Sequence, residues 1–171
     1  MAMPGVPEPA PMSPSPRLWR MRCAEVVTAV TGLAIVGGTG AGLAAGWAET
    51  GFLDLLMIRY NAAHRGAERD IFPLTSHRKL PVVTFTGLRW GALLTSTTED
   101  PPGYHPPTPR DCYRFCLANQ HVSVALAAPS DRRELEHDLA LLDDWCAPSR
   151  TELEAIRGHG DRVKRHAGVF W

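Results

Sequence analysis

The sequence has no excess of charge of either sign, and this absence narrows the class of protein. Its 171 residues include 18 Lys and Arg against 18 Asp and Glu, which gives a formal net charge of zero. A nucleic-acid-binding domain normally carries a basic patch, and no run of like charges here suggests a solvating tail. The composition therefore predicts no nucleic-acid partner. With 44% hydrophobic residues, it predicts one domain with a real core.

Paired cysteine motifs are also absent. The four cysteines are Cys23, Cys112, Cys116 and Cys146, and no two of them form a C-x-x-C motif. A zinc site needs four ligands, and no local histidine spacing completes one here. We therefore expect no metal site, and we expect buried, reduced thiols in a cytoplasmic protein.

Large apolar side chains are scarce at the N-terminus. Residues Met1–Pro16 are rich in Pro, Ala and Ser, so they cannot bury enough surface to offset the entropy of ordering. This segment also has no basic start followed by an apolar core, as a signal peptide would. The sequence predicts disorder over residues 1–20 and a folded domain over residues 21–168.

Charge is nearly missing from Ala24–Trp47, where Glu25 is the one charged residue. The stretch is long enough to span a membrane, so a membrane-associated protein is one hypothesis. Six glycines and few large aliphatic residues favour another interpretation, with no membrane partner. We expect helices at Met21–Val30 and Gly42–Glu49, with a strand at Leu33–Val36 between them.

The glycine-rich turn after this strand, Gly37–Gly42, approaches the dinucleotide-binding pattern G-x-G-x-x-G. Thr39 stands where the middle glycine belongs. The acidic residue expected about 20 positions later, at the end of the next strand, is also absent. The pattern therefore indicates a flexible strand-to-helix turn.

The remainder of the chain alternates between strand and helix patterns. Further strands are predicted at Phe52–Ile58, Pro81–Thr86 and Val122–Leu126. A polar loop at Asn61–Arg69 leads into a short helix that Pro73 helps to end. Strands that alternate with helices indicate an α/β fold with a parallel sheet. Length leaves a small doubly wound sheet and half of an eight-stranded barrel both open, since a whole barrel needs roughly 250 residues.

Three further helices are predicted, and two of them carry capping boxes. Thr108 and Asp111 form the first box, and Ser149 and Glu152 the second. The helix from Thr108 has an apolar side of Tyr113, Phe115, Cys116 and Leu117. The helix Arg132–Leu142 places Leu135, Leu139 and Leu142 on one face, and the last helix extends to Arg165.

Several stretches together resemble the aldo/keto reductases, and in particular a bacterial subgroup of that family. They are Asp54–Asn61 (DLLMIRYN), Val82–Leu88 (VVTFTGL), Val122–Ala128 (VSVALAA), Glu134–Leu139 (ELEHDL) and Arg59–Glu68 (RYNAAHRGAE). The spacing resembles the second half of that (β/α)8 barrel and covers about Leu33 to Asp144. The resemblance implies a partial (β/α)8 TIM barrel of about four βα units, strands five to eight, plus a C-terminal helix.

The resemblance also implies a cofactor, NADP (or NAD), at the carboxyl ends of the strands. Phe85 matches the aromatic residue that stacks on the nicotinamide, Thr86 and Leu88 match the loop along the pyrophosphate, and Arg89 or Trp90 extends that loop. Pro129 and Ser130 match the loop that meets the adenosine phosphate, and Glu134 and Asp138 match the positions that contact adenine. Met57 replaces the family's Gln that holds the nicotinamide amide. Tyr60 is expected to face the same site.

Some of these residues depart from the family pattern. Met57 cannot hydrogen-bond usefully, and Gly37–Thr39 replaces a Ser-Asn pair. The carboxylates of Glu134 and Asp138 would repel a 2′-phosphate, although Arg132 and Arg133 are close enough in sequence to compensate.

No catalytic residue is predicted. The family's Tyr, Asp, Lys and His lie on strands two to four, and Tyr60, Tyr104 and Tyr113 do not sit in the matching context. One hypothesis is therefore an incomplete oxidoreductase that does not reduce carbonyl compounds by itself. The alternative is a non-catalytic interaction module that completes its half-barrel with a second copy or another chain, because half a barrel has open sheet edges.

Overall fold

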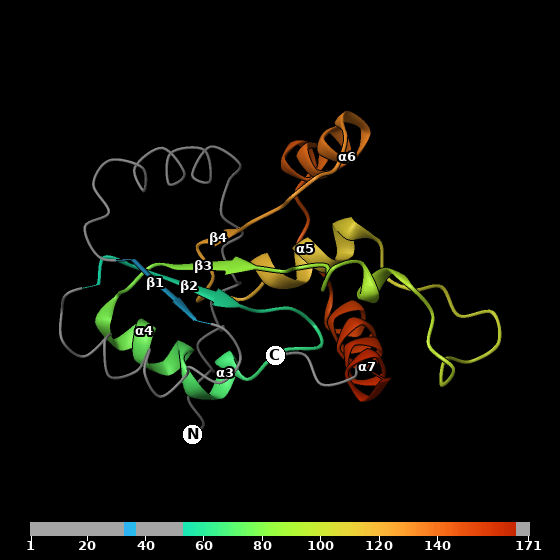
Figure 1. The fold of residues 1–171 in the computed structure, drawn as a ribbon, viewed down its shortest axis with the longest axis horizontal. Helices are drawn as coiled ribbons and strands as arrows, with labels where there is room; N and C mark the ends of the chain where they lie inside the picture. The colour runs from blue at the N-terminus through green and yellow to red at the C-terminus, as the bar shows by residue number, and fades with distance from the viewer. Residues whose placement is uncertain (1–32, 37–52, 167–171) are drawn as a thin grey trace, which may run out of the picture.

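The computed structural model describes residues 33–36 and 53–166, and it contains one parallel sheet. The strand order is β1-β2-β3-β4, with every neighbouring pair parallel. The strands are β1 (Leu33–Val36), β2 (Leu55–Arg59), β3 (Val82–Phe85) and β4 (Val124–Ala125). Figure 1 shows helices between β2 and β3 and between β3 and β4. The predicted α/β class with a parallel sheet is thus confirmed.

The three strands predicted after β1 are shorter in the structure than in the prediction. The largest difference is β4, which has two residues instead of Val122–Leu126. Its ladder to β3 is carried by the bonds from Ser123 N to the Val82 carbonyl and from Leu126 N to the Thr84 carbonyl, both 2.8 Å. A strand at the edge of a sheet has a neighbour on one side only, so fewer hydrogen bonds define its length. An apolar sequence alone therefore predicts a longer strand than the sheet forms.

Two short helices follow β2, and here the prediction for Pro73 was wrong. Helix α3 covers Ala67–Asp70, and α4 covers Phe72–Arg78 with Pro73 in its first turn. Proline fits a first turn because the N–H that it lacks has no intrahelical partner there. Pro73 therefore starts a helix, and α4 ends at Lys79, which has a left-handed φ of 55°.

The predicted capping boxes are confirmed. In α5 (Pro109–Leu117) the Thr108 hydroxyl accepts from Asp111 N, and the Asp111 carboxylate accepts from Thr108 N. In α7 (Arg150–His166) Ser149 and Glu152 bond each other in the same reciprocal way. The bonds to Ser149, backbone first, and to Arg114 lower the pKa of Glu152 to about 2.

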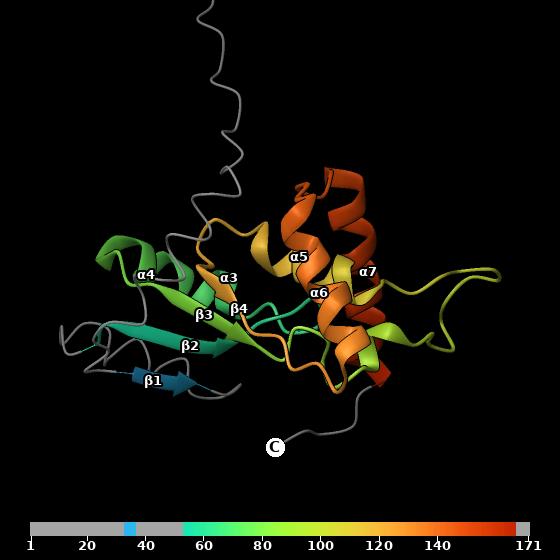
Figure 2. The same cartoon turned by 90° about the horizontal axis from the view of Figure 1, so that it is seen from above.

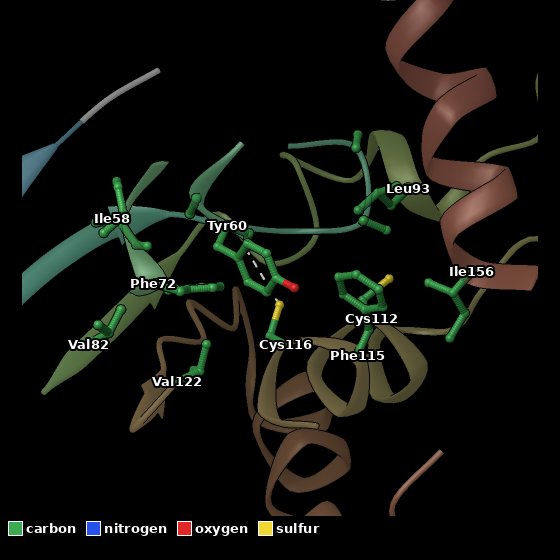
Figure 3. Packing of buried hydrophobic residues seen from close by; sticks show 14 of the residues in the cluster. Ile58, Tyr60, Phe72, Val82, Leu93, Cys112, Phe115, Cys116, Val122 and Ile156 are labelled. Atoms are coloured by element: carbon green, nitrogen blue, oxygen red, sulfur yellow. Dashed lines mark hydrogen bonds between the residues drawn. The ribbon is translucent and has the colours of Figure 1, made fainter. Parts of the chain in front are cut away.

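The core lies between one face of the sheet and helices α3, α4, α5 and α7. Leu56, Ile58 and Tyr60 alternate along β2 and its end, so they point to this same side. The Tyr60 ring packs edge-on against Phe72 at 5.1 Å and stacks with Phe115 at 5.8 Å (Figure 3). Tyr60 is therefore a core residue, and the expectation that it faces the cofactor was wrong.

Helix α6 (Arg132–Asp143) is confirmed as a helix, but its apolar face is exposed. Leu135, Leu139 and Leu142 are 43%, 49% and 43% exposed, and Leu141 is the buried residue of the helix. Figures 1 and 2 show α6 at the periphery, next to α5. The stripe of leucines predicted the helix correctly, but within the described chain it does not pack into the core.

The cysteine prediction holds in part. Cys112 and Cys116 are buried free thiols, and burial raises the pKa of Cys112 to about 12. Cys146 is exposed, which contradicts the prediction of burial. In the described ranges, no group of three or more His, Cys, Asp or Glu side chains is placed to hold a metal ion.

Several sequence-based expectations fall outside the described residues. These are the disordered residues 1–20, Cys23, the helices Met21–Val30 and Gly42–Glu49, and the Gly37–Gly42 turn. Of the stretch Ala24–Trp47, only strand β1 is described. Among the helices of the described ranges, none has the length and apolar character needed to cross a bilayer.

Candidate functional site

The carboxyl ends of β2, β3 and β4 meet at one edge of the sheet because the strands are parallel. Arg59, the last residue of β2, is in register with Phe85, the last residue of β3. The Leu126 N–H donates to the Thr84 carbonyl at 2.8 Å, which brings the end of β4 beside them. Phe85, Thr86, Leu88 and Arg89 thus lie on or just beyond these strand ends, whereas Glu134 and Asp138 lie in α6.

Met57 and Phe85 lie on the face of the sheet opposite the helical core. Side chains alternate between faces along a strand, and their neighbours Leu56, Ile58 and Val82 belong to the core cluster. Met57 and Phe85 are outside that cluster and half-buried. The Phe85 ring therefore lies on the face of the sheet away from the helical core.

Asn61 connects the ends of β2 and β3. Its side chain is fully buried, and its Nδ2 donates to the Thr86 carbonyl at 2.8 Å. Its Oδ1 accepts from the N–H groups of Ala63 and His64, each at 3.0 Å. The loop that was predicted from its polar residues is consequently fixed and largely buried. The sequence analysis did not identify Asn61 as a residue that joins the two strand ends. Its position shortly after a buried strand and before two alanines could have indicated a buried side chain.

The loop after β3 contains a run of left-handed backbone conformations. Thr86, Arg89, Trp90 and Gly91 have φ values of 56°, 51°, 52° and 84°. For a non-glycine residue such a conformation costs of order 1 kcal/mol or more. The turn is closed by bonds from Arg89 N to the Thr86 carbonyl and from Gly91 N to the Leu88 carbonyl. Strain of this kind persists where surrounding contacts hold it, and it is frequent at binding sites.

The side chain of Arg89 extends from this loop to α7. It is buried, and Nη1 donates to the carbonyl of Val163 in α7 at 3.3 Å. Burial, and secondly the charge of Arg59, lower the pKa of Arg89. Of the predicted loop residues, Arg89 thus contacts α7, and Trp90 is 67% exposed.

The residues predicted for the adenosine end lie together at the start of α6, after Pro129. Asp131 caps the helix by accepting from Glu134 N at 2.8 Å, and the Glu134 carboxylate accepts from Ser130 N at 2.7 Å. Asp138 is one turn further along, and its pKa is raised by burial and by the charge of Glu134. This end of the site is acidic.

Arg132 does not compensate this acidity directly. Its Nε pairs with Glu136 at 2.7 Å on the exposed side of the helix. Arg132 is thus paired with Glu136 and not with Glu134 or Asp138.

Comparison with known proteins gives a match in structure. No protein-family model and no curated protein sequence matches the chain. An aldo-keto reductase from Bacillus halodurans matches in its holo form with a TM-score of 0.57, at 16% identity, over 72% of this chain. The apo form of the same enzyme matches with a TM-score of 0.56, also at 16% identity and over 72% of this chain.

The chain has the fold of part of an aldo-keto reductase. It covers 48% of the holo and 49% of the apo structure, so it spans about half of the length of the enzyme that it matches. The resemblance predicted from the sequence is confirmed at the level of the fold.

Proposed function

We propose that this chain is an aldo-keto-reductase-like oxidoreductase fragment that carries half of a nicotinamide-cofactor site. In this proposal, β1 to β4 correspond to strands five to eight of a (β/α)8 barrel. The observation that carries the proposal is the position of Phe85. Its ring lies on the face away from the core, at a strand end, and directly before the left-handed loop that begins at Thr86.

The residues present fit part of a nicotinamide dinucleotide. Phe85 would stack on the nicotinamide ring, the loop Thr86–Leu88 would lie along the pyrophosphate, and Ser130 would meet the adenosine phosphate. In its reduced form, NADPH or NADH, the bound cofactor would supply a hydride. Met57 supplies no hydrogen bond to the amide, and Glu134 and Asp138 favour the cofactor without a 2′-phosphate.

The proposed fragment does not complete the reaction by itself. Carbonyl reduction needs a positioned proton donor as well as a hydride. Tyr60, the tyrosine nearest the strand ends, is buried and donates to Glu68 at 2.7 Å. Burial and the bond to Glu68 raise the pKa of Tyr60, so it is a poor acid.

A steady-state assay tests this part of the proposal. NADPH or NADH is mixed with a simple aldehyde and the purified chain, and the loss of nicotinamide absorbance is followed. A full-length aldo-keto reductase serves as the positive control. We expect no turnover above background from the chain, and measurable turnover would contradict the proposal.

A second function is favoured by the exposed face of α6. We propose that Leu135, Leu139 and Leu142, with Leu126 at the end of β4, form a contact for a second copy of this chain. These leucines are each more than 40% exposed, and in a closed barrel the next βα unit would cover such a surface. Without turnover, the chain would then act as an interaction module.

Sedimentation velocity at micromolar concentration tests this contact. We expect a dimer for the wild type and a monomer for Leu139→Glu, because the substitution places a charge in the contact. Glu136→Gln, on the polar side of the same helix, should leave the dimer intact. A wild-type chain that remains monomeric would remove this second function.

A further inference from the structure

Helix α7 contacts both loops of the candidate site. On the loop after β3, Arg89 Nη1 donates to the Val163 carbonyl at 3.3 Å. A second contact comes from His159, whose ring is fully buried and whose Nε2 lies 3.1 Å from the Leu93 carbonyl oxygen. On the loop after β2, the packing at Gly160 leaves no room for a Cβ atom. The position of α7 therefore determines where both loops lie.

Residues 95–104, which we term the strap, contact another part of α7. Figures 1 and 2 show the segment between β3 and α5 extending past α7, away from the sheet. The Tyr104 ring stacks on His159 with ring centroids 5.4 Å apart, and the Arg162 guanidinium lies 4.9 Å from the Tyr104 ring centroid. His159 and Arg162 are one turn apart on the helix. The strap thus contacts α7 within the same turns as the loop after β3.

One buried ion pair fastens the strap to α7. The Asp100 side chain is 4% exposed, and its Oδ1 accepts from Arg162 Nε at 2.5 Å while its Oδ2 accepts from Thr97 N at 2.6 Å. Removing one partner of a buried pair leaves an uncompensated charge. Glu99 also pairs with α7, through Arg165, but these side chains are 40% and 56% exposed. Exposed pairs contribute little, so Asp100 is the main attachment of the strap.

We propose that the strap is a conformational device that holds α7 against the loop after β3, with Asp100 as its latch. When Asp100 is bonded, contacts on both sides of α7 maintain the left-handed conformations of that loop. When the latch is released, α7 and the loop open together while the sheet stays formed. Asp100 is therefore a positioning residue that acts through Arg162. The opening itself needs no ligand, and its effect on cofactor binding rests on the proposed function.

Amide hydrogen exchange, measured by NMR on the full chain, tests the latch. Asp100→Asn keeps the shape of the side chain, but one of its two acceptor oxygens becomes an NH2 group that faces a donor. The Arg89 and Gly91 N–H groups bond within the loop after β3. They should exchange about tenfold faster or more, the loss expected for one charge-assisted hydrogen bond. The Leu56 N–H, bonded to the Pro81 carbonyl between β2 and β3, should be unchanged.

Further variants separate the latch from general stability. Glu99→Gln, on the same strap, should leave all of these exchange rates unchanged. Arg162→Gln should reproduce Asp100→Asn, and the double variant should exchange no faster than either, since all three remove one contact. Equal acceleration at Leu56 and in the loop would show general destabilisation, and acceleration confined to the strap would show no coupling. Either result would overturn the proposal.

Cofactor binding gives the reciprocal test on the wild-type chain. If the strap and the loop after β3 are coupled, a ligand that orders the loop must also stabilise the strap. Saturating NADH should therefore slow exchange of the Tyr104 N–H, which bonds the Pro101 carbonyl. NADH that binds without this effect would contradict the coupling. If NADH does not bind, the proposed function fails, and exchange in Asp100→Asn still decides whether the strap holds the loop.

Discussion

At the scale of single residues, Asn61 is the side chain that fixes the site. It joins the end of β2 to the Thr86 carbonyl and also holds two backbone N–H groups of its own loop. We predict that Asn61→Ala lowers the free energy of unfolding by about 3 kcal/mol, because buried polar groups lose their partners. Urea denaturation would measure this. Gln120→Ala, at an exposed position, is the control, and an equally small effect of both would contradict the assigned role.

A second residue-scale prediction concerns acid stability. Burial and neighbouring cations lower the pKa of His64 to about 4 in the native state, from an ordinary value of 6.5. Below pH 6.5 the unfolded chain binds a proton that the native chain does not, so stability falls as pH decreases from about 6.5 to 4.

In His64→Gln this contribution is absent. We therefore expect its urea midpoint to fall less than that of the wild type between about pH 7 and pH 5. His77→Gln, at an exposed position in α4, should behave as the wild type. If His64→Gln and the wild type lose the same stability, the native pKa of His64 is not lowered.

At the scale of elements, the packing of α7 depends on one glycine. A Cβ atom at Gly160 would lie 2.3 Å from the backbone carbonyl of Ala62 and 2.8 Å from Ala63 N. Because these are backbone atoms, the helix itself would have to move. We predict that Gly160→Ala destabilises the fold by about 3 kcal/mol.

The same helix provides the matched control. A Cβ atom at Gly158 would come within 3.6 Å of the Arg162 side chain alone. Gly158→Ala should therefore stabilise the fold by roughly 0.5–1 kcal/mol, through the helix propensity of alanine. Thermal unfolding of both variants would measure the difference. A Gly160→Ala variant as stable as Gly158→Ala would contradict the close contact of α7 with the loop after β2.

The elements also show what the sequence could predict. Local signals sufficed for the caps at Thr108 and Ser149, since each depends on side chains three residues apart. The direction in which a side chain points depends on tertiary packing, which local patterns do not contain. Tyr60 was expected at the site and lies in the core, and the leucines predicted on one face of α6 lie exposed.

At the scale of the whole molecule, the described chain has the fold of part of an aldo-keto reductase. Its sheet has the parallel order of a barrel segment, and it matches about half of a solved reductase. The resemblance predicted this fold.

The central claim, that one face of the strand ends forms part of a nicotinamide-cofactor surface, is most directly tested by cofactor binding. Fluorescence titration with NADH and NADPH should show saturable binding to the wild-type chain. Phe85→Leu should weaken it about three- to tenfold through loss of stacking. Met57→Gln should strengthen it by restoring an amide on the same face. No saturable binding to the folded wild-type chain, or binding that is unchanged in Phe85→Leu, would contradict the account.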